Sequence, residues 1–379
     1  MKMRANNFNS LVPRCLLALA YAAAVATILA SSPAYAGQIG DAAGRTPWTL
    51  TGGLLHARES FQATTLLDGQ VLAEGGDDSG TMLSSSVIFD PISKTWANSG
   101  NLNAARSLHS ATLLADGRVL VAGGEGAGFK ALDSTELYDP ASGTWTKTGN
   151  LIEPRQGHVA TALQDGRVLV VGGSGLHGDL GTAEIYDPAT GNWASTGGLE
   201  MQVVGATITL LTNGNVLIAG GFKPHTTTAV AELYDPVTGA WQPTGSMNFA
   251  RSEATATLLE DGQVLVAGGG PINAELYDPV TGTWTVSGKL NYSRANHTAT
   301  RLLDGSVIVT GGLGINDAIQ SVEVYNPATG KWRLDGSLNA PVYRHAAALL
   351  QDGEVVVAGG YYHNGIRGRM VAISQIGPP

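Results

Sequence analysis

The chain has 379 residues, of which 51 are glycine, 43% are hydrophobic and only 14% are charged, and its formal net charge is −9. This acidic balance, without a run of lysine or arginine, argues against nucleic acid and anionic membranes as main partners. Abundant glycine with modest charge is typical of many short strands joined by tight turns. A chain of this size and composition buries a large apolar core.

The first 36 residues have the order of a secretory signal peptide. Lys2, Arg4 and Arg14 precede an apolar stretch over 15–30, and a small-x-small pattern places cleavage after Ala36. The apolar stretch is shorter than the ~20 residues that a membrane-spanning helix needs. The sequence therefore predicts a secreted or periplasmic protein that is not inserted in a membrane after cleavage, with a linker over 37–47.

The single cysteine, Cys15, lies within this predicted signal. Its removal leaves a chain without a thiol or a disulfide, so packing alone has to hold the exported fold. Zinc–thiolate sites and cysteine nucleophiles are therefore not expected.

Two markers recur in the same register along the rest of the chain. Tryptophans recur at spacings of 48, 49, 48, 48, 43 and 48 residues, and Gly-Gly pairs share these spacings. The tryptophans are Trp48, Trp96, Trp145, Trp193, Trp241, Trp284 and Trp332. The pairs end at Gly76, Gly124, Gly173, Gly221, Gly269, Gly312 and Gly360. Such a period predicts a repeat fold in which each unit is one small sheet.

Each unit reads as four antiparallel strands, and the second unit shows the pattern. Its strands are expected near 106–114, 118–122, 135–138 and 144–146. Asp116-Gly117 separates the first two, and Asp-Gly favours the tight turn of a β-hairpin. The second strand is apolar throughout, as in a strand covered on both faces. Adjacent sheets of a β-propeller provide that cover.

The two ends of the repeat region predict how the ring closes. Trp48 belongs to a fourth strand with no first three strands before it, whereas the last unit has three strands, the third near 370–373, and no fourth. The N-terminal strand is therefore expected to complete the last blade, which leaves no free sheet edge. The prediction is an all-β, seven-bladed propeller over 48–374, with four antiparallel strands per blade and a tail over 375–379.

The Gly-Gly pairs, the tryptophans and a recurring tyrosine resemble the kelch repeat, whose period is about 50 residues. The tyrosines are Tyr138, Tyr186, Tyr234, Tyr277 and Tyr325. Kelch propellers include binding scaffolds, galactose oxidase and sialic acid epimerases, so the resemblance implies a fold and not one function. Galactose oxidase needs copper and a cysteine bonded to a tyrosine, which a mature chain without cysteine does not form. No cofactor and no metal are expected.

Arginines and histidines recur where the first strand of several units begins. The arginines are Arg58, Arg106, Arg155, Arg251, Arg294 and, in looser register, Arg344. The histidines are His109, His158, His297 and His345. Arginines around a channel mouth hold a carboxylate or phosphate well, and converging histidines hold a metal. The interpretation that we favour is architectural, with each arginine paired to a recurring glutamate, because a residue needed in every blade serves the blade.

Departures from the repeat are the better functional candidates. In the fourth unit Gln202-Val203-Val204-Gly205 replaces the arginine, and in the first unit Glu74 stands where others carry Ala, Val or Thr. Glu74 is either the buried partner of an arginine or, with His109 or His158, a catalytic acid–base. The variable loops between the second and third strands add further candidates for ligand binding. They are Asp77, Asp78, His225, Tyr361, Tyr362 and His363.

The leading functional hypothesis is a monomeric, non-enzymatic recognition module that binds a glycan, peptide or protein through its loop face. The first alternative is a carbohydrate-active enzyme similar to the kelch-type sialic acid epimerases, in which channel arginines hold an anionic sugar while Glu74 or a histidine moves protons. The second alternative is a structural envelope or matrix protein.

Overall fold

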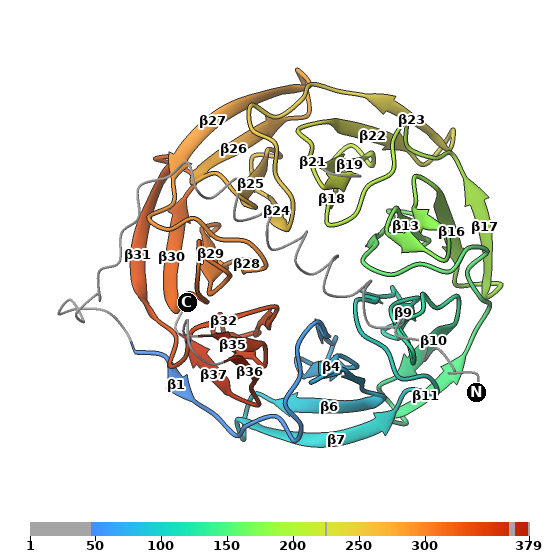
Figure 1. The fold of residues 1–379 in the computed structure, drawn as a ribbon, viewed down its shortest axis with the longest axis vertical. Helices are drawn as coiled ribbons and strands as arrows, with labels where there is room; N and C mark the ends of the chain where they lie inside the picture. Colours follow the sequence, from blue (N-terminus) through green and yellow to red (C-terminus); the bar gives the residue numbers. More distant parts are fainter. Residues whose placement is uncertain (1–46, 224–225, 364–367, 378–379) are drawn as a thin grey trace, which may run out of the picture.

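The computed structural model describes residues 47–223, 226–363 and 368–377. The predicted signal peptide, most of the predicted linker and His225 lie outside these residues. Within them the chain is all β, and seven four-stranded antiparallel sheets surround a central axis (Figure 1). No helix in the described ranges is long and apolar enough to cross a membrane.

The sheets follow one another along the chain as blades, each strand pairing with the next from the axis outward. Blade 1 consists of β2 (Gln62–Thr65), β3 (Val71–Glu74), β6 (Ser85–Asp90) and β7 (Thr95–Asn101). Blade 2 consists of β8 (Ser110–Leu113), β9 (Val119–Ala122), β10 (Thr135–Asp139) and β11 (Thr144–Lys147). Blade 3 consists of β12 (Val159–Ala162), β13 (Val168–Val171), β16 (Ala183–Asp187) and β17 (Asn192–Thr196). Blade 4 consists of β18 (Thr207–Leu210), β19 (Val216–Ala219), β22 (Ala231–Asp235) and β23 (Ala240–Pro243).

The last three blades repeat the arrangement. Blade 5 consists of β24 (Ala254–Leu258), β25 (Val264–Gly268), β26 (Asn273–Asp278) and β27 (Thr283–Lys289). Blade 6 consists of β28 (Thr298–Arg301), β29 (Val307–Thr310), β30 (Ser321–Asn326) and β31 (Lys331–Ser337). Blade 7 consists of β33 (Ala346–Leu349), β34 (Val355–Ala358), β37 (Ser374–Gly377) and the N-terminal β1 (Thr49–Leu50).

Short hairpins extend the loops between the second and third strands. They are β4 (Asp77–Asp78) with β5 (Thr81–Met82), β14 (Ser174–Gly175) with β15 (Gly178–Asp179), and β20 (Phe222–Lys223) with β21 (Thr226–Thr227). In blade 7, β35 (Tyr361–His363) pairs with β36 (Gly368–Met370) and with β32 (Val342–Tyr343). We call the side of the propeller that carries these hairpins the loop face.

The Gly-Gly pairs join each blade to the next. The second glycine of a pair donates its N–H to the carbonyl of the residue that opens the following blade, at 2.8 or 2.9 Å. The bonds run from Gly76 to Arg106, Gly124 to Arg155, Gly173 to Val203, Gly221 to Arg251, Gly269 to Arg294, Gly312 to Val342, and Gly360 to Arg58. The last of these bonds links blade 7 back to blade 1. The innermost strands also contact one another around the axis, with β33 against β2.

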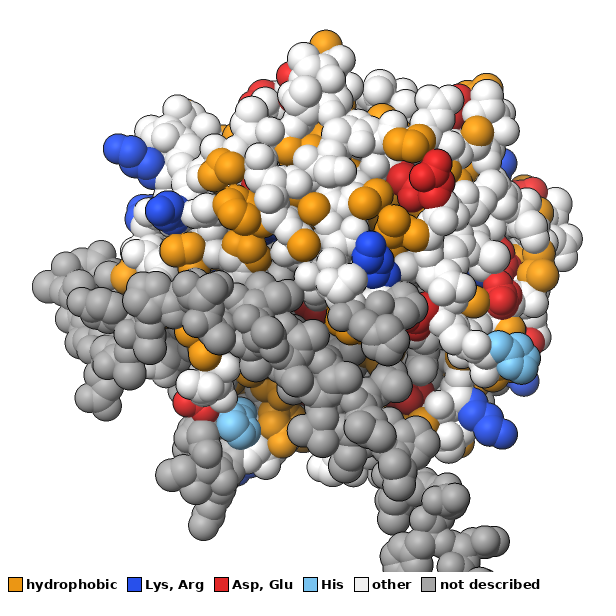
Figure 2. Space-filling view, turned by 45° about the horizontal axis from the view of Figure 1, so that its top comes forward, with side chains coloured by type: hydrophobic (Ala, Val, Ile, Leu, Met, Phe, Trp, Pro, Cys, Tyr) orange, Lys and Arg blue, Asp and Glu red, His pale blue; other side chains and the backbone are white. Residues whose placement is uncertain are grey.

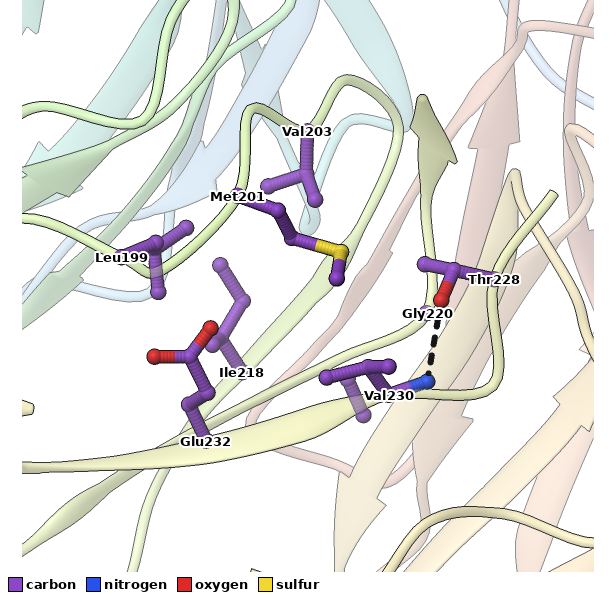
Figure 3. A pocket seen from close by; sticks show the side chains of 9 residues that line it. Leu199, Met201, Val203, Ile218, Gly220, Thr228, Val230 and Glu232 are labelled. Carbon is purple, nitrogen blue, oxygen red and sulfur yellow. Dashed lines mark hydrogen bonds between the residues drawn. The ribbon is translucent and has the colours of Figure 1, made fainter. Parts of the chain in front are cut away.

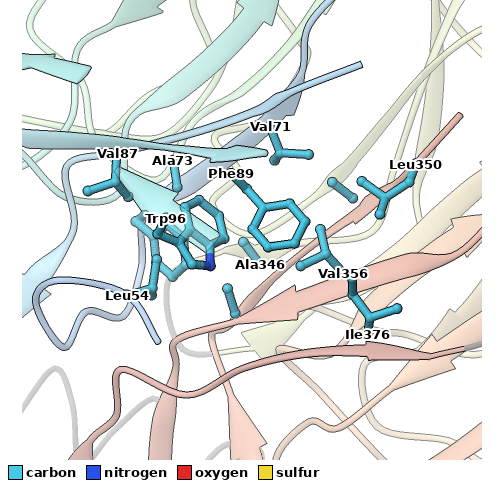
Figure 4. Packing of buried hydrophobic residues seen from close by; sticks show 13 residues of the cluster. Leu54, Val71, Ala73, Val87, Phe89, Trp96, Ala346, Leu350, Val356 and Ile376 are labelled. Atoms are coloured by element: carbon cyan, nitrogen blue, oxygen red, sulfur yellow. The ribbon is translucent and has the colours of Figure 1, made fainter. Parts of the chain in front are cut away.

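The N-terminal strand completes blade 7, as predicted. Thr49 and Leu50 pair with Ile376 and Gln375, and the Trp48 side chain is buried. Figure 4 shows the apolar cluster between blades 7 and 1, in which Val356 and Ile376 face Phe89 of blade 1. Burial of this apolar surface holds the first and last blades together.

The predicted third strand of blade 7 was misplaced. It lies at Ser374–Gly377, whereas residues 368–370 form β36 in the loop-face hairpin. The described strands of the propeller therefore reach Gly377, within the segment that was expected to be a tail. The loop of this blade is longer than in the others, and its third strand lacks the recurring tyrosine.

Two glycines with a left-handed backbone differ in how closely they are packed. Gly311 has φ +58°, and a Cβ there would lie 2.7 Å from His345 Cε1; Gly143 has φ +65°, and a Cβ there meets nothing within 4 Å. We expect Gly143→Ala to lose about 1–2 kcal/mol of unfolding free energy, and Gly311→Ala to lose about 1–3 kcal/mol more through overpacking. Urea denaturation measures both. Equal losses would contradict the packing role of the glycine pair.

Candidate functional site

Five of the six arginines expected at the channel mouth are buried inside the blades, each at most 1% exposed. In blade 2, Arg106 Nη2 donates to Glu136 Oε1 at 2.8 Å. Its Nη1 donates to the carbonyls of Gly123 and Ser134 at 2.7 and 2.9 Å. The same ion pair recurs at 2.7–2.8 Å between Arg155 and Glu184, Arg251 and Glu275, and Arg294 and Glu323. These arginines are thus structural, and a ring of exposed arginines for an anionic sugar is not formed.

Arg344 is not a member of this series, so its looser register was misleading. The carbonyl that accepts from Gly312 belongs to Val342, which takes the place that Arg106 has in blade 2. Arg344 follows two residues later, and its side chain is 39% exposed. In the sequence, Arg344 aligned only approximately with the other five arginines. The backbone hydrogen bonds show that it belongs to the loops of the loop face.

The four predicted histidines are buried, each in its own blade against the preceding one. His158 Nε2 lies 2.9 Å from Ser110 Oγ, His297 Nε2 lies 3.0 Å from Thr255 Oγ1, and His345 Nε2 lies 3.0 Å from Thr310 Oγ1. Burial, reinforced by nearby arginine, lowers the pKa of His158 and of His345 to about 3. These imidazoles are neutral spacers between blades. Across the described ranges, no group of three His, Cys, Asp or Glu side chains is placed to hold a metal.

Glu74 and His109 face each other between blades 1 and 2. His109 Nε2 lies 3.6 Å from Glu74 Oε1, and both side chains are fully buried. Burial raises the pKa of Glu74 well above its usual value, and the nearby Arg58 opposes this. Burial also lowers the pKa of His109, and Arg106 adds to this. The pair is sealed from solvent, so it is unsuited to proton transfer with a ligand.

Blade 1 lacks the strand glutamate of the repeat and carries the buried Glu74 on its second strand. Val87 occupies the place of Glu136, so Arg58 lacks a strand glutamate. Burial lowers the pKa of Arg58 to about 10, and Glu74 opposes this. The buried acid of blade 1 therefore lies on the second strand and not on the third, and because neither of its oxygens has a hydrogen-bond partner among the described residues, it does not form the arginine pair of the other blades.

An inner ring of loop residues, one per blade, surrounds the axis on the loop face. All seven have φ between +52° and +63°. They are Ser60, Leu108, Gly157, Gly205, Glu253, Asn296 and Arg344. Backbone N–H groups link neighbouring members of the ring at six of its seven steps, and the bond from Ser60 N to the Arg344 carbonyl, at 3.1 Å, joins blade 1 to blade 7. Non-glycine residues in this conformation carry strain, and such strain is often found at functional sites.

The loops of blades 7 and 1 build a patch next to this ring, which we call the 7–1 patch: Glu59, Asp77, Tyr343, Arg344 and Tyr361. Tyr343 and Tyr361 are paired across two strands, with ring centroids 5.5 Å apart. The Arg344 guanidinium lies 5.9 Å from the centre of the Tyr343 ring and 3.7 Å from Glu59 Oε1. Glu59 and Asp77 form a backbone bridge. The patch thus combines two aromatic faces, two carboxylates and one guanidinium.

Glu59 is the most enclosed acid of the patch. Burial raises its pKa, Arg344 lowers it, and Asp77 raises it further. The Glu59 Oε2 atom is buried, and no described residue forms a hydrogen bond with it. A carboxylate held in this way gains from a ligand that brings a positive charge or an N–H donor.

Other predicted loop residues surround the 7–1 patch. Tyr362 lies 5.8 Å from the Arg369 guanidinium, and His363 Nδ1 lies 3.2 Å from Asp317 of blade 6. Asp78 is half-buried beside Asp77. Figure 2 shows one face of the molecule, on whose described part acidic and basic side chains lie singly among polar and apolar ones.

Sequence reasoning missed Glu59, Tyr343 and the inner ring. The ring had a weak signal, since glycine stands two residues after Arg155 in blade 3 and two residues after Val203, which holds the arginine position, in blade 4. Glu59 and Tyr343 are 284 residues apart in sequence, and only the closure of blade 7 against blade 1 brings their loops together.

The seven sheets around the axis, the glycine links between them and the repeated strand pattern define a β-propeller. The chain belongs to the kelch-repeat family: the KLHDC2/KLHL20/DRC7 Kelch-repeats domain matches residues 61–269. The predicted fold and family are therefore confirmed.

Two further comparisons were made, with curated proteins and with solved structures. No curated protein matches the chain. A fungal alcohol oxidase of the AA5 family, solved in complex with copper, is similar in structure, with 20% identity and a TM-score of 0.73 over 89% of this chain and 77% of that chain. At this identity the likeness extends to the propeller and not to its copper chemistry.

Proposed function

We propose that this protein is a non-enzymatic recognition module that binds a peptide segment of a partner protein at the 7–1 patch. Kelch-repeat domains commonly mediate protein binding, which supports the class of function. The observation that carries the proposal is the patch itself, because its aromatic and charged side chains do not recur in the other blades. The recurring arginines, histidines and strand glutamates are instead buried in the frame.

The chemistry of the patch favours a segment with a lysine or arginine beside an apolar residue. Glu59 and Asp77 supply negative charge, while Tyr343 and Tyr361 offer ring faces that attract cations. The half-buried tyrosine rings also provide apolar contact area at low entropic cost. Arg344 pairs with Glu59, and this orients the carboxylate.

A peptide-display selection on the purified protein tests the proposal. Selected peptides are expected to contain a basic residue, and Tyr361→Ala is expected to weaken their binding at least tenfold, because it removes one face of the tyrosine pair. Val237→Ala is the matched control, since Val237 is 92% exposed in a turn away from the loop face. Peptides that bind Tyr361→Ala as well as the wild type, or a glycan array that yields ligands where display yields none, contradict the proposal.

We also propose that the protein is exported, with cleavage after Ala36. The support is the order of charges and apolar residues over 1–36. Intact-mass measurement of protein recovered outside the cytoplasm is expected to show a chain that begins at Gly37. A full-length chain confined to the cytoplasm contradicts this proposal.

A further inference from the structure

Blade 4 keeps the strand glutamate of the repeat but lacks the arginine that pairs with it. Val203 occupies the arginine position, since its carbonyl accepts from Gly173 as Arg106 accepts from Gly76. Glu232 occupies the glutamate position, opposite Ile218 on the neighbouring strand.

Blade 7 shows what the chain does elsewhere when the arginine is absent. There Val342 takes the arginine position, and the glutamate is replaced by the neutral Gln375 opposite Val357. Gln375 Oε1 still accepts from Asn339 N at 2.8 Å, so the glutamine serves the same loop without a charge. Blade 4 therefore retains a carboxylate that its own architecture does not require.

A small cavity lies beside Val203, Gly220, Val230 and Glu232, which stand at the positions that surround the arginine side chain in other blades. Its volume is about 10 Å³, room for about one water molecule. It is lined by Leu199, Met201, Val203, Ile218, Ala219, Gly220, Thr228, Val230 and Glu232. Figure 3 shows the Glu232 carboxylate beside Leu199, Met201 and Ile218 in this lining. Leu199 and Met201 are partly exposed, so the cavity lies close to solvent.

The backbone around the cavity matches a site that binds guanidinium in four other blades. In blade 6, Arg294 donates to the Gly311 carbonyl at 2.7 Å, to the Ser321 carbonyl at 3.1 Å and to Glu323 Oε1 at 2.7 Å. The corresponding positions in blade 4 are Gly220, Val230 and Glu232, which stand in the same strand register. The acceptors are in place, and the donor is missing.

Glu232 is also less well bonded than its counterparts. Glu232 is only 3% exposed, and the hydrogen bond that its Oε2 atom accepts from Glu200 N is 3.4 Å long. The equivalent bond from Asn291 N to Glu323 is 2.7 Å. A buried carboxylate without strong partners is costly, and it favours a ligand that supplies charge and N–H donors.

We propose that this cavity is an arginine socket, which takes the guanidinium group of an arginine side chain from a partner protein. Calcium does not fit, because it needs six to eight oxygen ligands and the socket offers only the Gly220 and Val230 carbonyls and the Glu232 carboxylate. An anion is repelled by Glu232. The cavity has room for only about one water molecule, so a guanidinium group enters only when the Met201 side chain moves aside, and methionine has three rotatable bonds that allow this. The socket is separate from the 7–1 patch and does not depend on the function proposed there.

Thermal unfolding with methylguanidinium as probe tests the socket, at constant ionic strength and at concentrations of about 10 mM or less, where denaturation is negligible. The wild type is expected to gain about 2 °C in Tm. Two variants are expected to lose this gain: Val203→Arg, which fills the socket from within, and Glu232→Gln, which copies Gln375 of blade 7. Methylammonium and sodium are expected to give no shift.

Two variants, Glu232→Gln and Tyr361→Ala, control for loss of folding and for binding at the 7–1 patch. Glu232→Gln is expected to fold, because blade 7 carries the same glutamine, and isothermal titration of this variant and the wild type measures the probe directly. Tyr361→Ala is expected to keep the methylguanidinium shift, which separates the socket from the 7–1 patch. A wild type without a shift, or an equal shift in the wild type and Glu232→Gln, overturns the proposal.

Discussion

Replacing Arg294 by alanine is expected to lower the free energy of unfolding by about 3–5 kcal/mol, because it leaves Glu323 as an uncompensated buried charge. The pair is fully buried at an N–O distance of 2.7 Å. Arg294 also donates to the Gly311 and Ser321 carbonyls, so its loss leaves further acceptors unsatisfied. Urea denaturation monitored by tryptophan fluorescence measures the change.

The chain provides its own control for this prediction. The double variant Arg294→Val with Glu323→Gln copies the Val342 and Gln375 of blade 7. It is expected to recover most of the lost stability, because the blade then contains no unpaired charge. If the double variant is as unstable as Arg294→Ala, the ion pair itself is not what the blade requires.

The second large effect is acid sensitivity, which follows from the buried histidines. The pKa of His158 and of His345 is lowered to about 3, and that of His109 and of His297 is lowered as well, in each case chiefly by burial. The unfolded chain takes up a proton near pH 6.5, whereas the folded chain does not. The contribution of these neutral histidines to the free energy of unfolding is therefore fully present above pH 6.5 and is lost as the pH falls toward 3.

Each such histidine contributes a slope of about 1.4 kcal/mol per pH unit below its unfolded pKa. Glu59, Glu74 and Glu232 act in the opposite direction, because their raised pKa values favour the folded state at low pH, but they are three groups against four. Unfolding free energies measured from pH 7 to pH 4.5 are expected to fall by several kcal/mol.

A single variant isolates one histidine in that profile. Phe61 occupies the histidine position in blade 1, where it lies against Gly359 as His345 lies against Gly311. His158→Phe copies this arrangement and is expected to reduce the slope by about 1.4 kcal/mol per pH unit between pH 6 and 4. An unchanged slope would show that His158 is protonated in the folded state.

The fold was predictable because each marker of the repeat has a physical task that recurs. The glycine pairs link successive blades. The tryptophans pack against an aromatic residue of the adjacent strand, as Trp145 does against Tyr138, with ring centroids 5.0 Å apart. The third strand of blade 7 was misplaced because Ser374–Gly377 lacks this aromatic partner, while Trp48 covers Gly377 from the other end of the chain.

The sites were less predictable, since they depend on contacts that the repeat does not encode. Periodicity favoured a structural role for the arginines, and the buried pairs agree with it. The 7–1 patch requires two distant loops to meet. The inner ring requires a left-handed backbone at Leu108, Glu253 and Arg344, which these residue types do not signal.

Hydrogen–deuterium exchange on the complex with a selected peptide tests the central claim most directly, namely that the repeated residues build the frame while the unrepeated loop face binds. Binding is expected to protect the loops around Glu59, Asp77, Arg344 and Tyr361, and to leave the turns on the opposite face, such as Asp116-Gly117, unchanged. Protection confined to those opposite turns would contradict the account.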